Sequence, residues 1–95
     1  MLIRIVKLTF KPENTTLFEQ IFEDTKPYIQ NFEGCNSVEL LQDIQDPNVF
    51  FTYSTWESED LLNRYRNSEF FKGIWGKTKQ LFDAKPEAWS TYKKT

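Results

Sequence analysis

The sequence lacks histidine altogether and contains one cysteine, Cys35, among its 95 residues. A lone cysteine cannot form an internal disulfide, and no imidazole exists to activate its thiol. Only carboxylates then remain as metal ligands, and Glu57, Glu59 and Asp60 are better explained as the start of a helix. We therefore expect no metal and no other cofactor, and we interpret Cys35 as a small packing residue.

An excess of positive charge is also absent, because the net charge is −2. This balance disfavours nucleic acid and anionic membranes as partners. The N-terminal run MLIRIVKLTF is too short and too charged, with Arg4 and Lys7, for a membrane span or a signal sequence. We therefore expect a cytoplasmic protein.

Aromatic residues are abundant instead and make up 17% of the chain. Large rings bury much apolar area per residue, so even a short chain can form a real core. Two domains would leave neither half with enough buried surface, which predicts one domain over residues 1–95.

The apolar periodicity predicts strands over residues 2–10, 36–44, 49–56 and 88–92, with a turn at 45–48. A helix is expected over 15–32, where Pro27 should kink the helix or split off its last turn and Gly34 should end it. Ser58 and Ser68 should cap the two parts of a second helical stretch. This β-α-β-β-α-β order is typical of a ferredoxin-like α+β fold, with an antiparallel sheet and helices on one face.

Both faces of the predicted strands are largely apolar. In the strand over 49–56, one face carries Val49, Phe51, Tyr53 and Thr55, and the other carries Phe50, Thr52, Ser54 and Trp56. Helices can cover only one face of such a sheet, so the other would remain exposed. A second copy of the sheet would cover it, which predicts a homodimer formed sheet to sheet.

Several segments together resemble the antibiotic biosynthesis monooxygenase family of dimeric α+β barrels. They are the strand that ends at Trp56, the following Glu57-Ser58-Glu59, the NSEFFK segment over 67–72, Phe32-Glu33-Gly34, and Pro86 with Trp89. The resemblance implies oxidation of a phenol, quinol or anthrone-like aromatic substrate by dioxygen, commonly without metal or flavin. Such chemistry needs a dry aromatic pocket, a group that takes or shares a proton, and a donor to the developing oxyanion.

The resemblance also suggests where these groups lie. Candidate lining residues for a pocket between sheet and helices are Tyr53, Tyr65, Phe71, Trp75 and Phe82. Candidate catalytic groups are Lys7, Tyr65 and Trp75, with Tyr53 as a further proton relay. For each of these residues, a structural role in the core or at a dimer interface is the competing interpretation.

Haem-degrading relatives of this fold provide a contrast. Their functional Trp and His fall on Tyr65 and Trp75, and their Asn falls on Val6 or Lys7. An indole offers no lone pair to iron, so the substitutions disfavour haem breakdown by that mechanism.

Three alternatives remain from the sequence. The chain could be a non-enzymatic small-ligand-binding or structural homodimer of the same fold, or an isomerase or cyclase that transfers a single proton. An RNA-recognition domain shares the element order, but the basic-Gly-aromatic signature is missing from NVFFTYST.

Overall fold

The computed structural model describes residues 1–95 and contains four strands and three α-helices. They follow the order β1 (Leu2–Thr9), α1 (Thr15–Gln30), β2 (Cys35–Gln42), β3 (Val49–Trp56), α2 (Glu59–Arg66), α3 (Glu69–Thr78) and β4 (Glu87–Tyr92). Short 3-10 turns, Pro12–Asn14 and Lys79–Leu81, precede α1 and follow α3. The predicted order of elements is confirmed, including the division of the second helical stretch.

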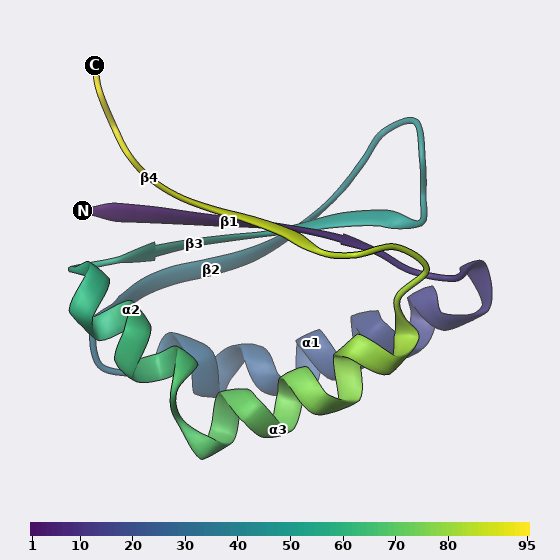
Figure 1. The fold of residues 1–95 in the computed structure, drawn as a ribbon, viewed down its shortest axis with the longest axis horizontal. Helices are drawn as coiled ribbons and strands as arrows, with labels where there is room; N and C mark the ends of the chain where they lie inside the picture. The colour runs from purple at the N-terminus through teal and green to yellow at the C-terminus, as the bar shows by residue number, and fades with distance from the viewer.

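The four strands form one antiparallel sheet in the order β2-β3-β1-β4. All three α-helices lie on the same side of this sheet, so the molecule has two layers and one open sheet face (Figure 1). This arrangement is the ferredoxin-like α+β fold that the sequence predicts. No helix combines the length and the apolar composition that a membrane crossing requires.

Both predicted serine caps are present. The Ser58 hydroxyl accepts a hydrogen bond from the Leu61 amide at 3.2 Å, and the Ser68 hydroxyl accepts one from Phe71 at 3.1 Å. These bonds satisfy amides that have no partner within the helix, so each serine fixes the start of its helix. Ser68 therefore marks the point at which the chain leaves α2 and begins α3.

Of the two effects expected of Pro27, the loss of the last turn of α1 does not occur, because the helix runs without interruption to Gln30. Proline removes its own amide donor from the helix, and its ring crowds the carbonyl four residues earlier. Pro27 is exposed to solvent, so the carbonyl that loses its partner can bond to water instead. The helix then closes with a bond from the Asn31 amide to the Pro27 carbonyl at 3.2 Å.

Two aromatic clusters join the helices to the sheet. At one end the buried Phe10 ring stacks on Phe18 of α1 at 4.2 Å and meets Phe50 of β3 edge-on at 5.9 Å. At the other end Trp56 of β3 lies 5.0 Å from the Tyr65 ring of α2. Aromatic pairs of this kind contribute roughly 0.5–1.5 kcal/mol each beyond the area that they bury. The helical layer is thus held at both ends of the sheet.

Gly34 ends the connection from α1 to β2 with φ of +88°, as the sequence predicts. Its α-carbon also lies against α2, where an added Cβ would come within 2.5 Å of the Leu61 Cβ. The position therefore requires glycine both for its backbone conformation and for the close approach of α2.

Gly34→Ala should lower the free energy of unfolding by at least about 2 kcal/mol, because the left-handed backbone conformation and the contact with Leu61 both oppose a side chain. Urea denaturation measures the change. Gly73→Ala is the matched control: an added Cβ meets nothing within 4 Å there, and alanine should stabilise α3 by about 0.5–1 kcal/mol. Equal effects of the two substitutions would contradict this account of Gly34.

Candidate functional site

A cavity of about 340 Å³ lies between the sheet and the helices. Its size falls at the lower end of the range for ligand pockets, roughly 300–1,000 Å³. Most of its lining is hydrophobic, and the aromatic part consists of Phe18, Phe22, Trp56, Tyr65, Phe71 and Trp75. These rings line the cavity without filling it, so a small molecule has room to enter.

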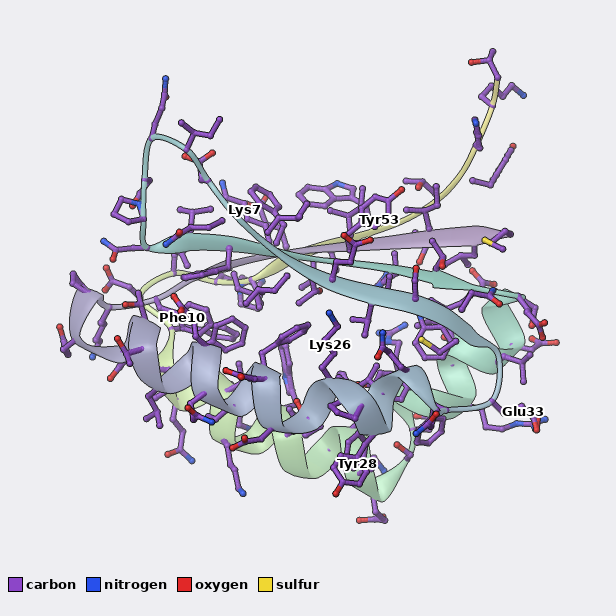
Figure 2. The ribbon with its side chains drawn as sticks, turned by 180° about the vertical axis from the view of Figure 1, so that it is seen from behind. Lys7, Phe10, Lys26, Tyr28, Glu33 and Tyr53 are labelled. Atoms are coloured by element: carbon purple, nitrogen blue, oxygen red, sulfur yellow. The ribbon has the colours of Figure 1, made fainter.

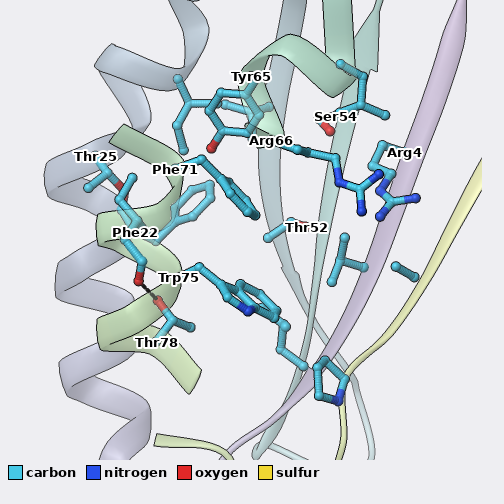
Figure 3. A pocket seen from close by; sticks show the side chains of 18 of the residues that line it. Arg4, Phe22, Thr25, Thr52, Ser54, Tyr65, Arg66, Phe71, Trp75 and Thr78 are labelled. Carbon is cyan, nitrogen blue, oxygen red and sulfur yellow. Dashed lines mark hydrogen bonds between the residues drawn. The ribbon is translucent and has the colours of Figure 1, made fainter. Parts of the chain in front are cut away.

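The walls of the cavity follow from the periodicity of the helices. Phe71, Ile74, Trp75 and Thr78 recur at helical spacing on α3, and all four face the cavity. The helix-facing residues of β1 and β3 form the floor (Figure 3). Thr78 satisfies its hydroxyl within the helix by donating to the Ile74 carbonyl at 2.8 Å, so this wall presents mainly apolar surface.

Tyr65 is the most constrained aromatic residue of the lining. Its ring lies 5.0 Å from Phe32 and 5.1 Å from Phe71, and only 7% of the residue is exposed. Burial, and secondarily the nearby Cys35, raise the pKa of the Tyr65 phenol well above its usual value. Tyr65 therefore stays protonated at neutral pH and can act as a hydrogen-bond donor but not as a base.

Two donors of the lining are free. The Tyr65 hydroxyl and the Trp75 indole N–H form no hydrogen bond within the chain. Every fully buried side-chain nitrogen or oxygen has a hydrogen-bond partner, so these two atoms are not fully buried. Trp75 is held in place by stacking on Phe71 at 5.9 Å and by an edge contact with Phe82 at 5.5 Å. The cavity can thus donate hydrogen bonds to an oxygen atom of a ligand.

One end of the cavity carries two positive charges that were not among the predicted site residues. Arg4 of β1 and Arg66 of α2 extend toward the same region, beside Ser54 (Figure 3). Burial, followed by the charge of Arg66, lowers the pKa of Arg4. The sequence does contain one indication of this charge. Arg4 shares a face of β1 with Leu2, Val6 and Leu8, and that face is otherwise apolar.

Three of the predicted site residues lie outside the cavity. Lys7 and Tyr53 point away from the helices, on the open face of the sheet (Figure 2). There the Lys7 ammonium lies 3.8 Å from the carboxylate of Glu87 on the neighbouring strand β4. Phe82 lies behind Trp75 and packs on Phe10 at 5.3 Å. The cavity therefore brings together Tyr65, Phe71 and Trp75, but not Lys7, Tyr53 or Phe82.

The buried phenol of Tyr65 should ionise only at strongly alkaline pH, because its folded-state pKa lies above its unfolded value of about 10. Its contribution to stability should be complete below that value and should be lost as the pH rises above it. Absorbance at 295 nm during alkaline titration should show a late step that Tyr65→Phe removes. Tyr53→Phe, which alters a tyrosine outside the cavity, should keep that step, and its loss there would contradict the assignment.

Solved structures of similar fold support this architecture. A conserved protein from Methanosarcina mazei Go1 matches 99% of this chain and 94% of its own, with 25% identity and a TM-score of 0.91. A protein from Nitrosomonas europaea, provisionally described as an antibiotic biosynthesis monooxygenase, matches all of both chains at 14% identity and a TM-score of 0.91. A protein from Pseudomonas aeruginosa covers 99% and 94% at 21% identity and a TM-score of 0.86.

No curated protein matches the chain. Residues 1–75, however, match the family model described as antibiotic biosynthesis monooxygenase. This segment contains the first three strands, α1, α2 and most of α3, and with them Tyr65, Phe71 and Trp75 of the cavity. Because the match extends over 75 of the 95 residues, the chain belongs to the antibiotic biosynthesis monooxygenase family.

Proposed function

We propose that the protein is a monooxygenase that oxidises a small phenol, quinol or anthrone-like substrate with dioxygen in the cavity between sheet and helices. The observation that carries the proposal is an aromatic cavity of about 340 Å³ in a chain of this family. Flat rings of a substrate would pack between Phe71 and Trp75 on one side and the β1–β3 floor on the other.

The proposed reaction balances without another reactant. In an anthrone-like substrate a methylene carbon becomes a carbonyl, and in a phenol or quinol a ring carbon that bears hydrogen is oxygenated. In each case one oxygen atom of dioxygen enters the product, and the other leaves as water with two hydrogens of the substrate. The substrate supplies all the electrons, so the proposal includes no flavin and no metal. The lining itself contains no histidine, thiol or carboxylate that would serve as a metal ligand.

The residues of the cavity would act through exclusion of water and hydrogen bonding. Apolar walls keep the ionised substrate poorly hydrated, which strengthens electrostatic interactions around it. The free Tyr65 hydroxyl and the Trp75 N–H would donate to the oxygen atom on which negative charge develops. In this proposal both residues stabilise the phenolate, and neither removes its proton.

Dioxygen consumption in the presence of anthrone and substituted hydroquinones tests the proposal. Wild-type protein should consume oxygen with at least one of these compounds, and Tyr65→Phe should slow the reaction by roughly tenfold or more because it removes one donor to the oxyanion. Tyr28→Phe is the matched control and should leave the rate unchanged, since Tyr28 is exposed on α1 and does not line the cavity.

Binding of these compounds without oxygen consumption would contradict the proposal. It would favour the alternative in which the protein is a non-enzymatic binding module that keeps the cavity. Conversion of a compound without oxygen consumption would instead favour the isomerase or cyclase alternative.

We also propose that two copies of the chain associate through the open sheet face. Large apolar side chains lie on that face, away from the helices: Ile3, Ile5, Leu41, Phe51, Tyr53 and Trp89. Of these, Leu41 is 45% exposed and Trp89 46% exposed, although both belong to regular strands. The face also carries both signs of charge, Lys7 on β1 and Glu39 on β2, so two copies of it need not repel each other.

Phe51→Glu should convert the homodimer to a monomer, because it places a carboxylate at the centre of the proposed interface. Light scattering at micromolar concentration measures the mass. Leu17→Glu serves as the control, since Leu17 is also half exposed, at 51%, but lies on α1 in the other layer. A monomeric wild-type protein would refute the proposed dimer.

A further inference from the structure

The cavity is unusual in its balance of charge. Its lining includes two charged residues, Arg4 and Arg66, and no aspartate or glutamate. The chain as a whole has a net charge of −2, so the positive charge of the cavity does not reflect an excess of basic residues in the protein. The positive charge is instead confined to one end of an aromatic cavity.

The register of the sheet explains how Arg4 comes to lie there. Arg4 is paired with Ser54 of β3 on one side and with Ser90 of β4 on the other, on the face that meets the helices. Its Nη1 donates to the Ser90 hydroxyl at 2.9 Å. Three polar side chains thus cross three strands as a short strip within an otherwise apolar floor.

Arg66 approaches this strip from the last turn of α2. Its Nη1 donates to the Asn63 side-chain oxygen at 3.3 Å. The two ion pairs of the molecule, Lys7–Glu87 and Arg64–Glu33, involve neither Arg4 nor Arg66. Because a guanidinium carries five N–H donors, most of the donors of both groups remain available.

An anion would be favoured at this end of the cavity. The charge of Arg66 acts on Arg4, and partial burial adds to the cost of the Arg4 charge. A carboxylate between them would offset one unit of this charge and could accept hydrogen bonds from both groups, because its planar shape matches the donor geometry of guanidinium. The rest of the cavity is mainly apolar and offers only uncharged polar groups.

We propose that the cavity selects aromatic carboxylates, with the carboxylate held by Arg4 and Arg66 and the ring system packed against Phe71 and Trp75. This inference rests on the proposed function, because it requires the same cavity to bind an aromatic ligand. It adds that the substrate class carries an anionic group at one end. The reacting part of the ligand would then lie toward Tyr65 and Trp75, at a distance from the guanidinium groups.

Binding of 2-naphthoate and its neutral amide, 2-naphthamide, tests the inference by calorimetry and by quenching of tryptophan fluorescence. Wild-type protein should bind the acid on the order of tenfold more tightly than the amide, as expected for charge-assisted hydrogen bonds. Arg66→Gln and Arg4→Gln should each remove most of that preference. Added salt should weaken binding of the acid more than binding of the amide.

Arg64→Gln is the matched control. Arg64 lies on the same helix, but it pairs with Glu33 at 3.2 Å and does not line the cavity. This variant should keep the preference for the acid. Arg66 is exposed, so Arg66→Gln should fold normally, and the test does not depend on the half-buried Arg4.

The outcomes separate the two proposals. Equal affinity for acid and amide in the wild type, or an unchanged preference in Arg66→Gln, would overturn the selection of carboxylates and leave the aromatic cavity standing. Absence of binding for both compounds would overturn the proposal that the cavity binds aromatic ligands and, with it, this inference.

Discussion

The cavity depends on aromatic contacts that fix the helices at both ends of the sheet. Phe10 and Phe18 join α1 to the sheet at one end, and Trp56 and Tyr65 join α2 to it at the other. Each contact uses rings that are too large to let the layers collapse onto each other. Space therefore remains between the two clusters, and the side chains that face it line a cavity rather than a closed core.

The same geometry divides the cavity into regions of different chemistry. Tyr65 and Trp75 provide neutral donors among apolar walls, whereas Arg4 and Arg66 bring charge to a single end. The Tyr65 phenol cannot accept a proton at neutral pH because burial keeps it protonated. The cavity is thus equipped to orient a ligand and to stabilise negative charge on it, and it relies little on acid–base groups of its own.

The positions of individual residues show how far the sequence could predict this site. Tyr65, Phe71 and Trp75 were expected at the cavity, and they face it because helical spacing leaves little choice of direction. Lys7 and Tyr53 were expected there too, and they lie on the opposite face. Alternation along a strand correctly predicts which residues share a face. Because both faces of β1 and β3 are apolar, it does not predict which face meets the helices.

The sequence by itself determined the element order, the two serine caps and the need for glycine at position 34, because these depend on local backbone chemistry. Only the tertiary structure decided which face of the sheet the helices cover. It also brought Arg4 and Arg66 together from segments that are far apart in the chain. Periodicity specifies which side chains share a face, whereas packing between layers specifies what that face meets.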